Sequence, residues 1–309
     1  MIAAAVGAAA TSCSGPPSAS NPDVRSFAQA RAAIENDIAA DVADATISIA
    51  GRSRLYDHGR PVTHAVLLFH GFTNAPQQFD ELARELYARG SNVYVPRIPH
   101  HGKKDRLTQD LVSLSVAELQ GFSERAFDLL RPLGSRTTVL GLSLGGTLTM
   151  WLAQTQPVDL AIPVAPFLMP YGWTRGVGGA TMRAAQLSPD FYWWWDARVL
   201  ENTRPAYAYP GYPIHALAQV TFLGDAIFDL ASRLKPLARR CTLVSNVDDT
   251  GINNDVSRAL LTAWQQHGAP YQELVLHDLG QPRHDIIDPT TFPAARTLVY
   301  PKLTALATS

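Results

Sequence analysis

The stretch VLGLSLGGTLTMW, Val139 to Trp151, decides the fold of this chain. It opens as an apolar run typical of a buried strand, breaks at Gly141, and resumes after Ser143 with residues that favour a helix. The glycines at positions 141 and 145 permit a tight, strained turn and leave room for neighbouring elements. The pattern is G-x-S-x-G, which predicts that the turn presents the Ser143 hydroxyl for chemistry.

The segments around this turn alternate between strand-like and helix-like patterns. Thr63 to Phe72 contains five consecutive apolar residues, as expected of a strand buried on both faces. The alternation predicts an α/β fold, with a mostly parallel central sheet and helices on both of its faces. Strand patterns occupy 63–72, 92–99, 137–142, 160–167, 241–247 and 272–279, and helix patterns occupy 21–43, 76–90, 116–132, 145–155, 253–268 and 295–306.

One long excursion interrupts the alternation, between the predicted strands at 160–167 and 241–247. An insertion of this length should have structure of its own, and such excursions often cover binding sites. We therefore predict a cap insertion at about residues 168–236. We expect most of its aromatic rings to pack a small core of the cap and some to line an apolar acyl pocket. These rings belong to Trp173, Phe191, Tyr192, Trp193, Trp194, Trp195, Tyr207, Tyr209 and Tyr212.

The first 23 residues differ from the rest of the chain. A short apolar run followed by Pro- and Ser-rich residues resembles a secretory signal and a linker, and Ala10 to Cys13 resembles a bacterial lipobox. We predict a leader at 1–23, a single domain at 24–309, and export, either as a secreted protein or as a lipoprotein anchored to the membrane through lipidated Cys13. The alternative is a disordered Ala-rich leader on a cytoplasmic protein.

Composition excludes several classes of partner. Lysine and arginine (26) nearly balance aspartate and glutamate (27), and no basic stripe stands out, so we expect no nucleic acid as a partner. Metal-binding spacings and a glycine-rich phosphate loop are absent from the sequence, so we expect no metal and no cofactor. Cys13 and Cys241 lie in unlike contexts, and Cys241 is expected to be a small core residue.

A serine hydroxyl needs a base to take its proton, usually a histidine oriented by a carboxylate. Asp248 and Asp249 follow the predicted strand at 241–247, and His284 lies in the loop after the predicted strand at 272–279. The carboxyl ends of parallel strands share one edge of the sheet, where ligands bind. We therefore predict that Ser143, one of the two aspartates and His284 meet there.

Other histidines have simpler explanations. His277 lies in or at the end of a strand, where core packing or a surface hydrogen bond accounts for it. His100 and His101 follow the predicted strand at 92–99, and we expect them at the rim of the site.

The assembled motifs resemble the α/β-hydrolases, and within them the carboxylesterase and monoacylglycerol-lipase-like branch. The resemblance spans about residues 62–306, with His100 standing where the family often has glycine. It rests on the stretches LLFHGF, RIPHHG, GLSLGG, DDTGIN and RHDIIDP, and on the chain order Ser, Asp, His.

The resemblance also implies roles for particular residues. The family's acid commonly stands three residues before an apolar residue and Asn, as Asp249 stands before Ile252, which favours Asp249 over Asp248. The backbone N–H of Leu144 and, by resemblance, that of Phe72 would form the oxyanion hole, and His70 would shape the loop that carries Phe72.

Three hypotheses follow. In the first, the protein is a serine carboxylesterase or lipase-like hydrolase that cleaves uncharged short- to medium-chain esters through an acyl-enzyme on Ser143. In the second, the same scaffold serves amide or peptide hydrolysis or acyl transfer. In the third, it is a non-catalytic binding protein, for which a nucleophile, base and acid in the right order would be superfluous.

Overall fold

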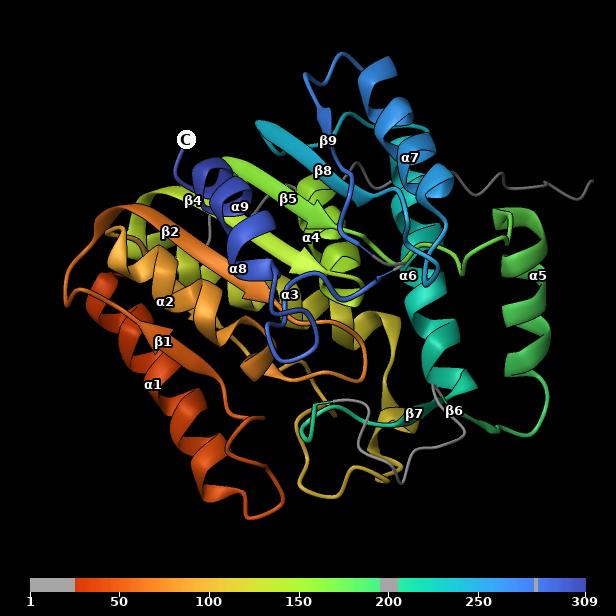
Figure 1. The fold of residues 1–309 in the computed structure, drawn as a ribbon, viewed down its shortest axis with the longest axis horizontal. Coiled ribbons are helices and arrows are strands. Elements are labelled where there is room, and N and C mark those ends of the chain that lie inside the picture. The colour runs from red at the N-terminus through yellow and green to blue at the C-terminus, as the bar shows by residue number, and fades with distance from the viewer. Residues whose placement is uncertain (1–25, 195–204, 281–282) are drawn as a thin grey trace, which may run out of the picture.

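A seven-stranded sheet forms the centre of the computed structural model, which describes residues 26–194, 205–280 and 283–309 (Figure 1). The strand order is β1-β3-β2-β4-β5-β8-β9; β1 pairs antiparallel with β3, and the other neighbouring pairs are parallel. The predicted mostly parallel sheet is confirmed, whereas β1 was not predicted because three residues carry too little periodicity. The strands are β1 (Arg54–Tyr56), β2 (Val62–Phe69), β3 (Asn92–Val95), β4 (Gly134–Leu142), β5 (Leu160–Val164), β8 (Arg240–Asn246) and β9 (Gln272–Leu276).

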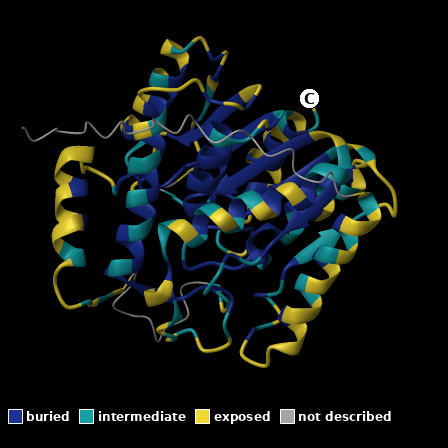
Figure 2. Ribbon diagram, turned by 180° about the vertical axis from the view of Figure 1, so that it is seen from behind, coloured by how far each residue is buried: buried dark blue, intermediate teal, exposed yellow. Residues whose placement is uncertain are grey.

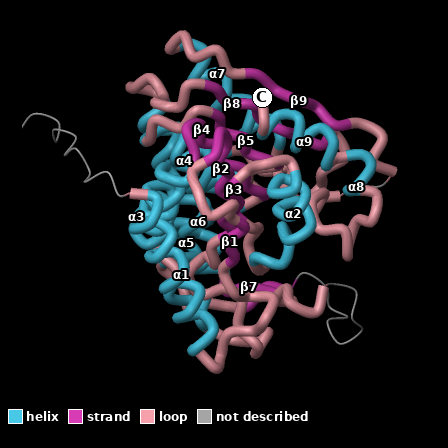
Figure 3. Tube along the Cα trace, turned by 90° about the vertical axis from the view of Figure 1, so that its left-hand side faces the viewer, coloured by secondary structure: helices cyan, strands magenta, loops and turns pink. Residues whose placement is uncertain are grey.

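Helices cover both faces of the sheet, with α2, α8 and α9 on one side and α1, α3 and α4 on the other (Figure 3). The helix α4 that follows Ser143 is buried along nearly its whole length, because it lies between the sheet and α6. The helices are α1 (Phe27–Ala43), α2 (Asp80–Ala88), α3 (Val116–Leu130), α4 (Leu144–Thr155), α5 (Arg175–Gln186), α6 (Ile214–Ala231), α7 (Asn254–Gln266), α8 (Ala295–Leu298) and α9 (Tyr300–Ala307), with short 3₁₀ turns η1 (Pro76–Phe79), η2 (Asp110–Ser113) and η3 (Arg131–Leu133).

Three predicted helices differ from the observed ones, each at a proline. The pattern at 116–132 ends as α3 at Leu130 and continues as the 3₁₀ turn η3, which contains Pro132. The helix pattern at 76–90 begins as the 3₁₀ turn η1 with Pro76 at its start, and the α-helix proper runs from Asp80. The pattern at 295–306 is divided into α8 and α9 at Val299, two residues before Pro301. Proline has no backbone N–H to continue a helical ladder, which explains the division.

The excursion between β5 and β8 contains α5, a two-stranded sheet of β6 (Tyr192–Trp194) and β7 (Gly211–Pro213), and α6. Figure 1 shows α5 as the outermost element, beside α6. The expectation that most cap rings pack a core is wrong for Trp173, Phe191, Trp193 and Trp194, which are 37%, 52%, 54% and 45% exposed. Tyr209 and Tyr212 are buried, and Trp195 lies outside the described residues. Burial in the cap is thus concentrated on the side that faces the sheet (Figure 2).

α6 is long and apolar enough to cross a membrane by length and composition. More than half of it is buried against the rest of the domain, as in a core helix of a globular protein. The predicted leader at 1–23 and Cys13 lie outside the described residues, so the leader and its lipidation stay predictions.

Candidate active site

Ser143 stands at the turn between β4 and α4 with φ 57° and ψ −115°. A positive φ is uncommon for a residue with a side chain, and such strained backbone gathers at functional sites. The turn is held on both sides, because the Ser143 N–H donates to the carbonyl of Val164 at 3.0 Å and the Ser143 carbonyl accepts from the N–H of Phe167 at 3.1 Å. The sequence therefore produces the strained elbow that its motif predicts.

The glycines of the motif allow close approach. A Cβ on Gly141 would lie 2.1 Å from the carbonyl oxygen of Gly145, and a Cβ on Gly145 would lie 2.0 Å from that of Phe69. Neither distance is tolerable between carbon and oxygen. The first turn of α4 consequently lies against the end of β2, where the loop that carries Phe72 begins.

Asp249 and His284 are in direct contact. The Nδ1 atom of His284 lies 2.8 Å from Oδ2 of Asp249, whose side chain is fully buried. The other carboxylate oxygen of Asp249 accepts hydrogen bonds from the N–H groups of Gly251 and Ile252 at 2.7 and 3.3 Å. Asp248 is exposed. Because the carboxylate binds Nδ1–H, it favours the tautomer in which Nε2 carries the lone pair.

The backbone around His284 is fixed as well. Asn246, fully buried at the end of β8, donates from Nδ2 to the carbonyl of Arg283 at 2.7 Å. The imidazole lies over Gly251, where a Cβ would stand 2.8 Å from the ring. Any larger residue at 251 would displace the ring from its carboxylate.

The predicted oxyanion donors lie at the same edge of the sheet. Leu144 is the first residue of α4, so its N–H has no intrahelical acceptor. The carbonyl of Gly71 accepts from Asn74 N–H at 3.1 Å and contacts Nδ1 of His70 at 2.9 Å. In a trans peptide the N–H of Phe72 points opposite to that carbonyl, so its direction is fixed too.

His70 holds the carbonyl of Gly71 as a neutral imidazole. Burial lowers its pKa well below the usual value, and its Nε2 accepts the N–H of Ile98 at 3.1 Å. With Nε2 as acceptor, Nδ1 carries the proton and donates to Gly71. The role that the resemblance assigned to His70 agrees with these contacts.

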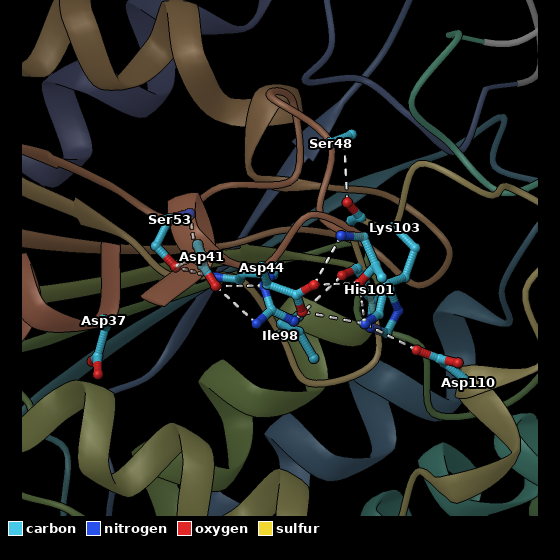
Figure 4. Close-up of polar contacts among 12 residues, drawn as sticks. Asp37, Asp41, Asp44, Ser48, Ser53, Ile98, His101, Lys103 and Asp110 are labelled. Atoms are coloured by element: carbon cyan, nitrogen blue, oxygen red, sulfur yellow. Dashed lines mark hydrogen bonds and ion pairs between the residues drawn. The ribbon is translucent and has the colours of Figure 1, made fainter. Parts of the chain in front are cut away.

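The loop after β3 runs beneath the cap rather than along the rim. His101, expected at the rim, is fully buried; its ring is parallel to that of Tyr209 at 6.2 Å, and burial lowers its pKa to about 4. His100 contacts Glu118 of α3 at 2.9 Å. Arg97, just before this loop, pairs with Asp41 of α1 at 2.8 Å, and Lys103 pairs with Asp44 at 3.6 Å. Figure 4 shows Asp41, Asp44 and Lys103 in this group of polar contacts.

A short segment before β7 ties the cap to these loops. The N–H of Tyr209 donates to the carbonyl of Thr73 at 2.7 Å, and its hydroxyl donates to the carbonyl of His100 at 3.1 Å. Two residues earlier, the hydroxyl of Tyr207 binds the carboxylate of Asp288. The base of the cap thus contacts both the oxyanion loop and the chain just after His284.

Sequence reasoning missed Gln78 and Asn246, two buried amide side chains that bear on these loops. Gln78 lies in a helix-like stretch and Asn246 within a strand, and neither belongs to a recognisable motif. Within residues 26–194, 205–280 and 283–309, no group of three or more His, Cys, Asp or Glu residues is placed to hold a metal ion.

A family model described as the alpha/beta hydrolase family matches residues 66–301, and the chain belongs to that family. The chain is 32% identical over 109 residues to a thermostable monoacylglycerol lipase from Bacillus sp. strain H-257, a match that covers 35% of this chain and 42% of the lipase. It is 31% identical over 96 residues to a pyrethroid hydrolase from Sphingobium wenxiniae, covering 31% of this chain and 32% of that enzyme. These matches thus span less than half of either relative.

The crystal structure of Paleococcus ferrophilus monoacylglycerol lipase has a similar fold, with a TM-score of 0.60 at 18% identity. The likeness covers 82% of this chain and 98% of the lipase. At this identity it shows the fold alone.

Proposed function

We propose that this protein is a serine hydrolase of uncharged carboxylic esters with short to medium acyl chains. The observation that carries the proposal is the 2.8 Å contact between His284 Nδ1 and the buried carboxylate of Asp249, at the edge of the sheet where the Ser143 elbow lies. A serine on a strained elbow, a histidine of defined tautomer and a buried carboxylate are the parts that acyl transfer requires.

In the proposed reaction the Oγ of Ser143 attacks the ester carbonyl while Nε2 of His284 takes its proton. Asp249 stabilises the resulting imidazolium without itself taking a proton. The N–H groups of Phe72 and Leu144 bind the negative oxygen of the tetrahedral intermediate. His284 then returns the proton to the leaving alcohol, and a water molecule, activated by the same imidazole, releases the acid from Ser143.

Support for an uncharged, apolar substrate comes from the surroundings of the oxyanion loop. The ring of Phe72 lies 5.3 Å from that of Tyr212 and 5.8 Å from that of His101, which is neutral. Monoacylglycerols are uncharged carboxylic esters, and two of the similar proteins are named as monoacylglycerol lipases.

Ester and amide substrates separate this proposal from amidase or peptidase activity on the same fold. We expect p-nitrophenyl esters from acetate to decanoate to be hydrolysed with kcat/KM at least about a hundredfold above the matching anilides. Alanine replacing Ser143 should abolish this turnover. Faster cleavage of the anilides would contradict the proposal, and transfer of the acyl group to added alcohols in preference to water would indicate an acyltransferase.

We also propose, on the leader pattern alone, that the protein is exported and anchored through lipidated Cys13. Metabolic labelling of a bacterial host with an alkyne fatty acid should mark the full chain but not a Cys13→Ala variant. Equal labelling of both, or of neither, would contradict the anchor.

A further inference from the structure

One buried side chain connects the two loops that the proposed chemistry brings together. Gln78, 1% exposed in the turn η1, accepts the N–H of Gly71 on Oε1 at 2.7 Å. Its Nε2 donates to Oδ2 of Asp285 at 2.8 Å, across 207 positions of sequence. Gly71 precedes the oxyanion residue Phe72, and Asp285 follows the base His284.

At the first end, Gln78 completes the immobilisation of Gly71. The carbonyl of Gly71 is held by His70 and Asn74, and its N–H is held by Gln78. With both ends of this residue fixed, the peptide plane that carries the Phe72 N–H has little freedom to turn.

At the other end of the Gln78 side chain, both carboxylate oxygens of Asp285 accept hydrogen bonds. Its Oδ1 accepts from the N–H groups of Ile287 and Asp288 at 3.1 and 3.0 Å, and its Oδ2 accepts from Gln78. Such a turn fixes the backbone immediately after His284. Burial raises the pKa of Asp285, while the hydrogen bonds from Gln78 and the two backbone N–H groups act in the opposite direction and favour the charged carboxylate.

We propose that Gln78 is a positioning residue that keeps the backbone N–H of Phe72 and the imidazole of His284 at a fixed separation across the site. This role rests on the proposed ester hydrolysis. Gln78 touches neither the substrate nor the reacting atoms. It acts by joining the two loops directly, through one hydrogen bond to each of them. Displacing one reacting group by about 1 Å is enough to cost roughly a hundredfold in rate.

The direction of the hydrogen bonds supplies a sharp test. The side-chain amide of Gln78 accepts from the Gly71 N–H through Oε1 and donates to Asp285 through Nε2. Gln78→Glu places a carboxylate against that of Asp285. Asp285→Asn forces its new NH₂ group against either Gln78 Nε2 or the N–H groups of Ile287 and Asp288. The double variant restores every bond, because Glu at 78 accepts from both Gly71 N–H and the new NH₂ group at 285.

The experiment measures kcat and KM for p-nitrophenyl butyrate in the wild type, both single variants and the double variant. We expect each single variant to lose about ten- to a hundredfold in kcat with KM changed less than about threefold, since binding is unaffected and only transition-state contacts are lost. The double variant should recover to within about fivefold of the wild type. Gln77→Glu, which adds the same charge one residue away, serves as the matched control and should stay within about twofold.

A second readout separates positioning from mere folding. A trifluoromethyl ketone forms a tetrahedral adduct with the serine, so its inhibition constant should rise in each single variant by the factor by which kcat/KM falls. Single variants with wild-type kinetics, or a double variant that is unfolded or no better than the weaker single one, would overturn the positioning role. Absence of Ser143-dependent turnover in the wild type would instead overturn the proposed function.

Discussion

The loops at the carboxyl edge of the sheet and the outer side of the cap are built in opposite ways. At the edge, Asp249, Gln78 and Asn246 are at most 2% exposed. Gln78 and Asn246 each bind a backbone group of a neighbouring loop, and Asp249 binds the side chain of His284 and a backbone N–H of its own turn. On the outer cap, Leu187 is 91% exposed and Trp193 is 54% exposed. The first region is determined by hydrogen bonds whose directions leave little choice of residue, whereas the second makes few contacts that restrict its sequence.

This difference implies that the sheet edge and the outer cap tolerate substitution to very different degrees. Removing the hydrogen-bond partner of a buried polar group destabilises the folded protein, so substitutions at the sheet edge should lower activity or stability strongly. Exposed apolar groups have no such partner to lose, so changes on the outer cap should be nearly neutral in stability.

The largest effect is expected for the nucleophile and its base. Ser143→Ala and His284→Ala should each lower kcat for p-nitrophenyl butyrate by about 10⁴-fold or more, since either change removes the proton-coupled attack. The exposed cap serine variant Ser188→Ala is the control and should keep wild-type turnover. Retention of a tenth of the activity in either active-site variant would show that the chemistry lies elsewhere.

The two neighbouring aspartates should differ sharply. Asp249→Asn removes the carboxylate that holds His284 and should lower kcat by about 10³- to 10⁴-fold. Asp248→Asn changes an exposed side chain and should stay within about twofold. Equal losses in the two variants, measured under the same conditions, would refute the assignment of Asp249 as the orienting acid.

Alanine substitutions at two glycines, each near the start of a helix, compare the stability of the sheet edge with that of the cap. Gly145→Ala in α4 would place a Cβ 2.0 Å from a carbonyl oxygen, so we expect a loss of more than about 2 kcal/mol in the free energy of unfolding. Gly176→Ala in α5 meets nothing within 4 Å and should leave stability unchanged or raise it by up to about 1 kcal/mol. Urea unfolding of both variants measures the difference, and similar values would contradict the comparison.

Acid should destabilise the region beneath the cap. The pKa of His101 is about 4 in the folded protein, against an ordinary value of 6.5. Between these two pH values the imidazole is protonated in the unfolded chain but neutral in the folded protein. Stability from this group is therefore present above pH 6.5 and lost as the pH falls toward 4, by on the order of 3 kcal/mol.

Replacing the ring with His101→Phe should flatten the slope of unfolding free energy against pH in that window. The exposed His277→Gln variant is the matched control and should keep the wild-type slope. An unchanged slope in His101→Phe would show that other groups cause the acid sensitivity.

The smallest effects concern aromatic residues of the cap. Tyr209→Phe removes a hydroxyl that binds the carbonyl of His100 and the N–H of Lys103, and should cost about 1–3 kcal/mol in stability. Trp193→Ser changes an exposed ring and should stay within about 0.5 kcal/mol, with unchanged turnover of p-nitrophenyl acetate. Thermal unfolding distinguishes them, and a larger loss in Trp193→Ser would mean that the outer cap is not structurally neutral.

Sequence patterns predicted the sheet, the elbow at Ser143 and the aspartate that contacts His284, because these depend on short-range periodicity and on motifs with fixed spacing. They did not predict Gln78 or the burial of His101, since both depend on which distant loops meet in three dimensions. Gln78 is one of two adjacent glutamines, and only the fold shows that it, and not Gln77, joins Gly71 to Asp285. The exposed rings of Phe191, Trp193 and Trp194 were predicted wrongly for a related reason, because aromatic composition does not reveal which side of a cap faces the sheet.

The most direct test of the central claim is covalent labelling by a fluorophosphonate, with the modified residue located by mass spectrometry. We expect rapid, stoichiometric modification of Ser143 in the folded protein, and slowing by several orders of magnitude when His284 is replaced by alanine. Folded wild-type protein that remains unlabelled at Ser143, or that is labelled equally fast without the imidazole, would contradict it.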